Sequence, residues 1–345
     1  MTGSMSLNKS LEAEFFFQHG LLLSEKKNYE EAIVSFDTAI NIQFDYHSAL
    51  CQRGFALGNL NRHEEALISF NAALAIKPDT SWIWHNRGIA LGKLNRHEEA
   101  LNSFDRALEF NPDSANSWHN RGITLSDLGN YEKAIVSFEQ SVKLQPQAYW
   151  AWYNLGIALG KIGRYEQALN CFDRALEFNP DDFNCWYNRG ITLSHCGYHE
   201  KAIVSFDKAL QIKPDANPAW YNRGVAFWRI GNQEEAMASF DKTFASETDD
   251  YCAWFNRGLT LAQIGLLAEA IAAYNKVLEF KPDEHKAFYN KACCYAQQGN
   301  VELAIENLLA AIALNPDEYK IKAQEDSDFD KIRQDERFGA LVNTR

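Results

Sequence analysis

Apolar and polar residues recur along this chain with a period of 34 residues. The sequence from residue 13 to residue 318 divides into nine blocks of that length without insertion or deletion. Position 4 of a block is aromatic or leucine, position 8 is glycine in eight blocks, position 20 is alanine in all nine, and position 24 is phenylalanine in seven. At about 100° per residue, positions 4, 8 and 11 share one helix face, and positions 20, 24 and 27 share another. Each block therefore predicts two short amphipathic helices. The blocks are 13–46, 47–80, 81–114, 115–148, 149–182, 183–216, 217–250, 251–284 and 285–318.

Each block also carries signals for where its helices end. Glycine at position 15 of the last six blocks predicts a turn that closes the first helix. Proline at position 32 of seven blocks predicts the end of the second helix. Glycine at position 8 is expected to lie opposite the alanine at position 20, where the two backbones approach closely. Block 217–250 has Thr248 in place of the proline, so we expect a weakly stopped, mobile second helix near 243–250.

The two ends of the chain differ from the blocks. Residues 1–12 form an N-terminal extension, of which residues 1–4 precede a second methionine and are expected to carry no fold information. Residues 319–345 are interpreted as capping helices, one over 319–325 and one that starts at Ser327. Such a cap is needed because the last unit of a repetitive array otherwise exposes an apolar face. Phe15, Phe16 and Phe17 make the N-terminal end unusually apolar, and self-association through that end is a hypothesis.

The 34-residue pattern resembles the tetratricopeptide repeat. The sequences AWYNLG at 151–156 and YEQAL at 165–169 are close to the motif of that family. The resemblance implies an all-α fold: an α-solenoid of nine helix-turn-helix repeats plus a C-terminal capping helix. It also implies a right-handed superhelix whose first helices line the concave side. The sequences of the blocks resemble those of repeat arrays abundant in cyanobacterial and other bacterial proteins.

Composition narrows the class of protein. With 46% hydrophobic and 23% charged residues the chain can bury a core, which excludes a disordered protein. Lys and Arg total 34 against 46 Asp and Glu, and this net charge of −12 argues against binding to nucleic acid. No stretch is long and apolar enough to predict a membrane span. Seven cysteines at no regular spacing favour reduced thiols and a cytoplasmic protein.

Candidate reactive groups are explained by their positions in the blocks. His195, Cys196 and His199 straddle a predicted helix turn and match metal-ligand spacing only loosely, so packing or surface roles are favoured. The glycine-rich stretches 88–93 and 156–161 are one residue short of a phosphate loop and lie within a predicted helix. We therefore expect no catalytic residue, no metal site and no cofactor, and a protein that is not an enzyme.

Asparagine recurs on the face of the first helix that lies opposite its core face. This opposite face consists of positions 2, 5, 6, 9, 12 and 13. Position 6 is asparagine in seven consecutive blocks: Asn86, Asn120, Asn154, Asn188, Asn222, Asn256 and Asn290. A side-chain amide matches the donor and acceptor of a peptide group and can hold an extended chain without reading its side chains. The series resembles the asparagine ladder in the repeats of O-GlcNAc transferase, which implies peptide binding. Alternatively, the amides bond to neighbouring repeats and only order the stack.

Aromatic residues give a second signal on the same face. The tryptophans outside position 4 all fall on position 2 or 12: Trp82, Trp150 and Trp228. Position 5 is aromatic or histidine in seven blocks: His85, His119, Tyr153, Tyr187, Tyr221, Phe255 and Tyr289. Aromatic side chains in a concave, partly desolvated surface are typical binding anchors. Packing between adjacent first helices is the alternative, and it weighs more for the tyrosines than for the tryptophans.

Arginine at position 7 of six blocks lies on the seam with the preceding block. The acidic residue at position 25 of that block (Asp37, Asp105, Asp173, Asp207 or Asp241) is its predicted partner, and Arg189→Ala is expected to destabilise the fold by more than a surface substitution. Leu155 interrupts the series.

The partner expected from these features is an extended protein segment. The family includes a class that grips the acidic C-termini of chaperones with lysine at position 5 and asparagine at position 9. Here position 5 is aromatic or histidine and position 9 is apolar in almost every block, so an apolar or aromatic segment in the concave groove is favoured. Two alternatives remain open. One is a regulatory or targeting module of a larger enzyme, such as a glycosyltransferase or signalling protease. The other is a scaffold that acts by self-association, as a homo-oligomer, or through its convex face.

Overall fold

The computed structural model describes residues 2–243 and 251–343, with side chains from residue 9 onward. The chain forms two compact units, residues 1–180 and 181–345. The first unit contains α1 (Thr2–Glu25), α2 (Tyr29–Ile42), α3 (His47–Asn59), α4 (His63–Ile76), α5 (Ser81–Lys93), α6 (His97–Phe110), α7 (Ala115–Asp127), α8 (Tyr131–Leu144), α9 (Tyr149–Lys161) and α10 (Tyr165–Phe178). The second contains α11 (Phe183–His195), α12 (His199–Ile212), α13 (Asn217–Arg229), α14 (Gln233–Thr243), α15 (Tyr251–Gln263), α16 (Leu267–Phe280), α17 (His285–Gln297), α18 (Val301–Leu314), α19 (Pro316–Glu325), the 3-10 helix η1 (Ser327–Ile332) and α20 (Glu336–Asn343).

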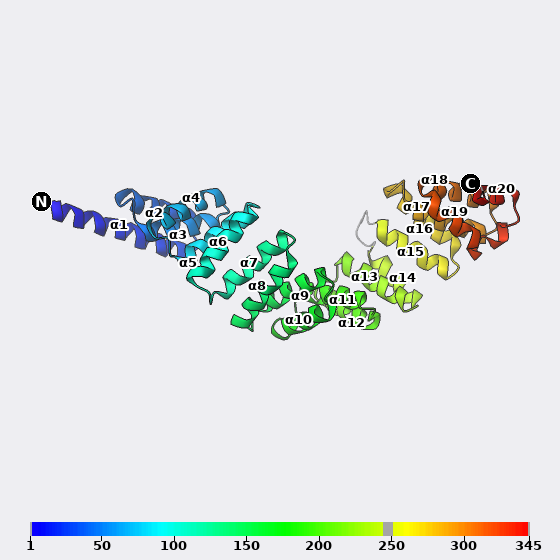
Figure 1. Ribbon diagram of the computed structural model, residues 1–345, viewed down its shortest axis with the longest axis horizontal. Helices are drawn as coiled ribbons and strands as arrows, with labels where there is room; N and C mark the ends of the chain where they lie inside the picture. The colour runs from blue at the N-terminus through cyan, green and yellow to red at the C-terminus, as the bar shows by residue number, and fades with distance from the viewer. Residues whose placement is uncertain (1, 244–250, 344–345) are drawn as a thin grey trace. The chain divides into compact units, whose positions relative to one another are not determined.

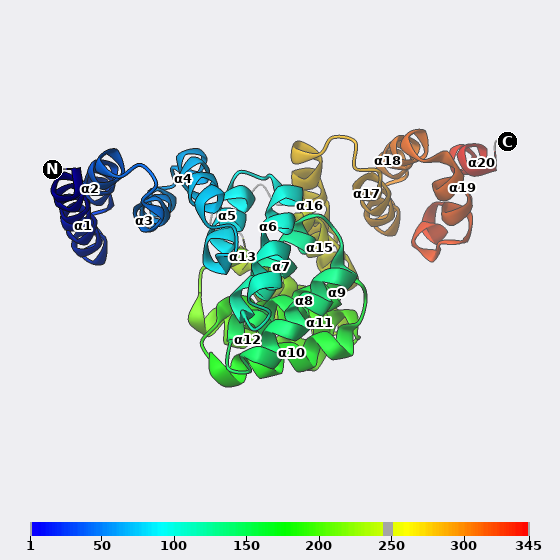
Figure 2. The same cartoon turned by 60° about the vertical axis from the view of Figure 1, so that its left-hand side comes forward.

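Within each unit, every helix of the repeats packs against the next one in the chain, so the helices form a row of pairs (Figure 1, Figure 2). The described residues contain no strand, and each unit is an α-solenoid, as predicted. None of the described helices is long and apolar enough to cross a membrane. The predicted mobile segment near 243–250 lies outside the described residues except for Thr243, which is buried.

The turn between the two helices of a block has a left-handed residue at position 15. The six glycines at this position have φ between 73° and 83°, which confirms the predicted turn. In the first three blocks the same conformation is adopted by Lys27, Asn61 and Asn95, with φ of 61°, 59° and 58°. The turn geometry is therefore kept even where glycine is absent.

The nearest atoms to a side chain added at position 8 belong to the aromatic ring at position 24. A Cβ atom on Gly88 would lie 2.7 Å from Cε1 of Phe104, and the other seven glycines show 2.5–2.8 Å to the equivalent ring atom. Phe104 is only 2% exposed and cannot move aside without disturbing the core. Glycine at position 8 thus makes room for the aromatic residue at position 24.

Gly88 and Gly92 give a matched pair of substitutions on the same helix. Gly88→Ala is expected to lower the free energy of unfolding by about 1–3 kcal/mol, because the new methyl group overpacks the core. Gly92→Ala is expected to raise it by up to about 1 kcal/mol, because a Cβ there meets no atom within 4 Å and alanine favours the helix. Urea unfolding followed by circular dichroism measures both changes. Equal shifts for the two variants would contradict this packing.

The tryptophan at position 4 joins its block to the preceding one. Trp84 is half-buried, and its indole N–H donates to the carbonyl of Pro78 in the preceding block at 2.7 Å. Trp118, Trp152 and Trp220 make the same bond to Pro112, Pro146 and Pro214 at 2.8–2.9 Å. The buried residue of the first turn is at position 3 instead, as at Ile83. The recurring proline therefore also supplies an acceptor that joins successive blocks.

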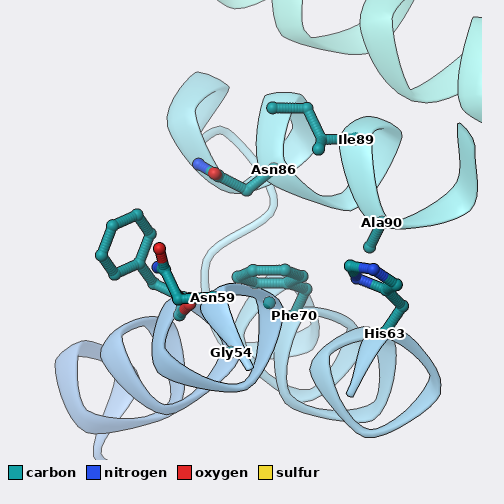
Figure 3. A pocket seen from close by; sticks show the side chains of 9 residues that line it. Gly54, Asn59, His63, Phe70, Asn86, Ile89 and Ala90 are labelled. Atoms are coloured by element: carbon teal, nitrogen blue, oxygen red, sulfur yellow. The ribbon is translucent and has the colours of Figure 1, made fainter. Parts of the chain in front are cut away.

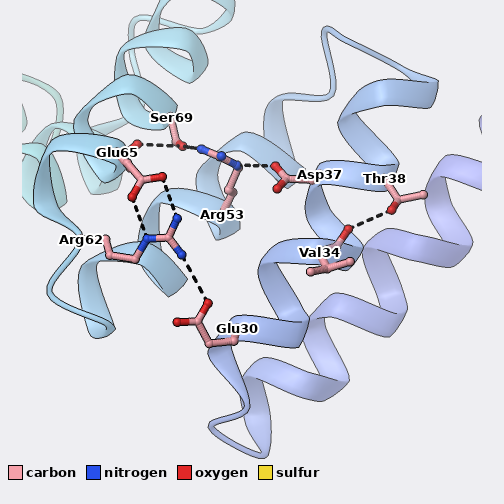
Figure 4. A network of polar contacts seen from close by, with 8 residues as sticks. All are labelled: Glu30, Val34, Asp37, Thr38, Arg53, Arg62, Glu65 and Ser69. Atoms are coloured by element: carbon pink, nitrogen blue, oxygen red, sulfur yellow. Dashed lines mark hydrogen bonds and ion pairs between the residues drawn. The ribbon is translucent and has the colours of Figure 1, made fainter.

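Arginine at position 7 links three helices. Arg53 donates from Nε to Asp37 of the preceding block at 2.5 Å and from Nη1 to Ser69 of its own block at 2.6 Å (Figure 4). The pair with the acidic residue at position 25, predicted from the sequence, recurs for Arg121, Arg223 and Arg257. The bond to a buried serine at position 23 recurs for Arg87, Arg121, Arg189 and Arg223. In block 149–182, Leu155 and Cys171 replace the arginine and the serine, and both are buried.

The C-terminal elements cover the last repeat. Tyr319, Phe329, Ile332 and Phe338 are each at most 2% exposed and share one core with α17 and α18. The expected single helix after Ser327 is instead η1 followed by α20, and the capping residue is Asp326, whose side chain accepts from the backbone N–H of Asp328. At the N-terminal end, by contrast, Leu11 and Phe15 on α1 are more than 60% exposed.

Candidate functional site

Two pockets of the first unit lie on the face built by positions 2, 5, 6, 9, 12 and 13 of the first helices, which we call the first-helix face. The α3/α5 pocket has a volume of about 220 Å³, and the α5/α7 pocket has a volume of about 200 Å³. The α3/α5 pocket is lined by Gly54, Phe55, Gly58, Asn59, His63, Phe70, Asn86, Ile89 and Ala90 (Figure 3). The α5/α7 pocket is lined by Gly88, Ile89, Gly92, Lys93, Phe104, Asn120, Ile123, Thr124 and Asp127. Most of the second set occupies the block positions of the first set, one repeat further along.

Each of these pockets contains one asparagine of the predicted ladder. Asn86 and Asn120 enter the pockets from α5 and α7, beside the apolar side chains of Ile89 and Ile123. Nδ2 of Asn86 donates to the backbone carbonyl of Trp82 at 2.7 Å, one helical turn earlier. Asn154 makes the same bond to Trp150 at 3.0 Å. This bond orients the amide and uses one of its two N–H groups, so a second N–H and the carbonyl oxygen remain for another partner.

The asparagines of the second unit are more fully engaged. Nδ2 of Asn222 donates to the carbonyl of Pro218 at 2.8 Å and to the hydroxyl of Tyr187 at 3.1 Å. Asn256 donates in the same way to Cys252 at 3.0 Å and to Tyr221 at 2.6 Å. These two amides link successive first helices, which is the stack-ordering alternative. In the same unit, Asn188 donates to its own helix, and Asn290 is half-buried on α17.

The histidines at position 5 are held by the next repeat. Nδ1 of His85 lies 2.9 Å from the hydroxyl of Ser117, and burial lowers the pKa of His85. The ring of His119 packs against Trp150 with centroids 4.2 Å apart. No described residue bonds to its buried Nδ1. Burial lowers the pKa of His119 to about 4, so this imidazole is neutral at physiological pH.

His119 predicts a loss of stability in acid. Its pKa in the folded state is about 4, below the value of about 6.5 expected in the unfolded chain, so the unfolded state binds the proton first. Its contribution to stability is therefore complete above pH 6.5 and is lost as the pH falls from 6.5 to about 4, by about 3 kcal/mol in total. His119→Phe removes this part of the pH dependence. Urea unfolding of both proteins from pH 4 to pH 8 measures the difference, and parallel pH profiles would contradict the prediction.

The aromatic residues of the second unit are mostly packed against their neighbours. Tyr187 stacks on Phe183 with centroids 5.8 Å apart and accepts the bond from Asn222. A third pocket, of about 180 Å³, lies between α13, α15 and α17 and contains three aromatic rings. It is lined by Tyr221, Tyr251, Cys252, Phe255, Asn256, Glu284 and Lys286.

Tyr289 is not available to a partner, which corrects the expectation from its position. It is 2% exposed, stacks on Tyr319 at 4.7 Å, and donates its hydroxyl to Asp326 at 2.7 Å. The reason is that the chain after residue 315 folds back over α17. The remaining position-5 residue of the first unit, Tyr153, is half-buried with its ring 6.1 Å from that of Phe172.

The three surplus tryptophans have different surroundings. Trp82 is 42% exposed, with its ring 6.1 Å from that of Phe55 in the α3/α5 pocket. Trp150 is half-buried against His119. Trp228 is half-buried under Arg229, and its indole nitrogen is buried without a hydrogen-bond partner among the described residues. Of the three, Trp82 is the one most open to a ligand.

Two features were missed from the sequence. Glycine at position 12 leaves open space, because a Cβ on Gly58, Gly92 or Gly160 would meet no atom within 4 Å; the recurrence of glycine there was the available signal. The ligand atoms of Cys293, Asp326 and Asp328 lie within 4.8 Å of one another. Both carboxylates already accept hydrogen bonds, from Tyr289 and from Gln297, so this cluster joins the C-terminal elements to α17.

Family models match nearly the whole repeat region, and all carry the description tetratricopeptide repeat. They match residues 13–46, 47–80, 79–147, 149–182, 171–204, 200–249, 251–284 and 285–318. No curated protein matches the chain.

Several solved structures resemble parts of this chain. A tetratricopeptide repeat protein from Parabacteroides merdae is 20% identical, with a TM-score of 0.53 over 73% of this chain and 99% of that chain. The C-terminal part of a repeat protein from Cytophaga hutchinsonii is 19% identical, with a TM-score of 0.60 over 69% and 97%. YrrB, described as a TPR protein with an unusual peptide-binding site, is 26% identical, with a TM-score of 0.49 over 53% and 95%. At these identities, the first two comparisons concern the fold alone.

Proposed function

This chain belongs to the tetratricopeptide repeat family, a family of protein-interaction scaffolds, and we propose that its first unit binds an extended segment of a partner protein on the first-helix face. The observation that carries this proposal is the pairing, in both pockets, of an asparagine amide with an apolar wall. Asn86 and Asn120 supply the amides, and Ile89 and Ile123 supply the walls. The amides would bond to the backbone of the segment, and the pockets would take apolar side chains. No catalytic step and no cofactor is part of this function.

The asparagines of the first unit are proposed to bind, whereas Asn222 and Asn256 of the second unit order the stack. Asn86 and Asn154 each use one side-chain N–H in a bond to their own helix. Asn222 and Asn256 use both, because each also donates to a tyrosine hydroxyl. A ligand that needs a donor and an acceptor from each amide is better served by the first unit. The aromatic anchor best suited to this function is Trp82, because it is the most exposed of the surplus tryptophans.

A triple variant tests the proposal. Changing Asn86, Asn120 and Asn154 to alanine is expected to weaken peptide binding by about 10–1,000-fold, because each hydrogen bond contributes about 0.5–1.5 kcal/mol. Peptides selected from a random display library on the unaltered chain serve as ligands, and fluorescence anisotropy measures each dissociation constant.

A matched control replaces three exposed asparagines on second helices of the same unit, Asn41, Asn102 and Asn170, by alanine. This control is expected to bind within about twofold of the unaltered chain. If both triple variants bind the selected peptides equally well, the first-helix face is not the binding surface.

A further inference from the structure

We infer that the segment bound by the first unit adopts the polyproline II conformation and carries apolar side chains three residues apart, with residues i and i+3 entering the α3/α5 and α5/α7 pockets. This inference rests on the proposed function. It adds the conformation of the ligand and the spacing of its anchoring side chains.

The two pockets are neighbours separated by a single helix. Ile89 on α5 lines both, and α5 touches α3 on one side and α7 on the other. Packed helices lie about 8–10 Å apart. Because the pockets are built from equivalent positions of successive repeats, their centres are separated by about one such interval.

This interval selects among ligand conformations. In a β-strand, side chains on the same side recur after two residues, at about 6.7 Å, or four residues, at about 13.4 Å, and neither matches the interval. In polyproline II, three residues complete one turn and advance about 9.3 Å, so side chains i and i+3 point the same way at the required spacing. A helix would place residues i and i+7 about 10.5 Å apart, which also fits.

The asparagines distinguish polyproline II from a helix. A helical ligand satisfies its backbone groups internally and would offer none to the second N–H of Asn86 or to the side-chain amide of Asn120. A polyproline II segment has no internal hydrogen bonds, so its carbonyl and N–H groups are free to bond to these amides. Only an extended ligand therefore makes apolar contacts with the pocket walls and also forms hydrogen bonds with the amides beside them.

The pockets also have unused room. A Cβ atom on Gly58 or Gly92 would meet nothing within 4 Å, although both residues lie in the last turn of their helices. The same position holds Ser126 on α7 and Trp228 on α13. Space at position 12 is thus a property of particular blocks, and the two adjacent pockets combine it with an asparagine and an isoleucine.

The test uses the full chain and a set of labelled proline-rich peptides of about twelve residues. Two leucines are placed at i and i+3, at i and i+2, at i and i+4, or at i and i+7 in a helix-forming host, and a further peptide has alanine at i and i+3. Fluorescence anisotropy is expected to show the i,i+3 leucine peptide binding about 10–100-fold more tightly than any other, because only this peptide places both side chains in pockets and also leaves its backbone groups free to bond to Asn86 and Asn120.

Filling one pocket with a larger side chain provides an independent test of the inference. Gly92→Leu fills the α5/α7 pocket and is expected to weaken the i,i+3 peptide about tenfold or more. Asn102→Leu places a leucine on the exposed surface of the second helix α6, away from the first-helix face, and is expected to leave binding unchanged. Circular dichroism melting verifies that both variants fold.

The outcomes separate this inference from the proposed function. If another spacing binds as tightly, or if both leucine variants weaken binding equally, the polyproline II assignment is wrong. The proposed function survives that result if the triple asparagine variant still loses affinity for the selected peptides. If the helix-forming peptide binds best, the ligand is a helix and the asparagines do not read its backbone.

Discussion

Phe329→Ala is expected to lower the stability of the C-terminal repeats by about 3–5 kcal/mol, the usual effect of removing a fully buried aromatic side chain. Phe329 is completely buried, with its ring 5.8 Å from that of Tyr289 on α17 and 5.4 Å from that of Phe338 on α20. Its loss leaves a cavity at the point where the C-terminal elements meet the last repeat. Urea unfolding monitored by tryptophan fluorescence and circular dichroism measures the change.

Ile321→Ala is the matched control, because Ile321 lies in the same C-terminal segment but is 62% exposed. It is expected to change stability by less than about 0.5 kcal/mol. Because stability in a repeat array is a sum over neighbouring units, the effect of Phe329→Ala should be concentrated in α17–α20. Amide hydrogen exchange that accelerates equally throughout residues 181–345 would contradict this expectation.

Arg121→Ala is expected to destabilise the first unit by about 2–4 kcal/mol. Arg121 donates to Asp105 at 2.6 Å and to the buried Ser137 at 2.7 Å, and its guanidinium lies over the ring of Trp118. Alanine removes two charge-assisted hydrogen bonds and a contact with an aromatic ring. Thermal unfolding of the variant and the unaltered chain measures the loss.

The chain itself suggests the control for this prediction. In block 149–182 the corresponding residues are Leu155 and Cys171, so Arg121→Leu combined with Ser137→Cys copies a pairing that the fold already uses. This double variant is expected to recover at least half of the stability lost in Arg121→Ala, because it fills the space with apolar groups and leaves no buried hydroxyl that needs the arginine. A double variant as unstable as Arg121→Ala would show that the hydrogen bonds, and not the packing, dominate.

The helices could be predicted from the sequence because their signals are local. Amphipathic periodicity, the turn glycines and the prolines at position 32 each act within one helix or turn, and the structure confirms them. The close contact between the glycine at position 8 and the ring at position 24 was not predicted. A helical wheel gives the face on which Gly88 lies. The ring of Phe104 reaches Gly88 from another helix, and the spacing of residues along the sequence does not give the distance between two helices.

Predictions about the binding face were limited by interactions between helices. The position of Tyr289 in its block was read correctly, but its burial depends on how residues 316–343 fold back, which the repeat pattern does not contain. The difference between Asn86 and Asn256 is also nonlocal, since it depends on the hydroxyl of Tyr221 in the preceding block. The asparagines at position 6 could be found from the sequence, whereas the number of side-chain N–H groups that each of them has left for a ligand could not.

The seams between successive blocks of the first unit differ in whether the arginine at position 7 forms an ion pair, and so they differ in their response to salt. Added salt screens partly exposed ion pairs and so weakens seams held by pairs such as Arg53 with Asp37 and Arg121 with Asp105. The seam between α8 and α9 has Leu155 in place of the arginine, and in the seam between α4 and α5 Arg87 donates to the neutral amide of Asn71 at 2.8 Å. Added salt is therefore expected to weaken the α2/α3 and α6/α7 seams relative to these two.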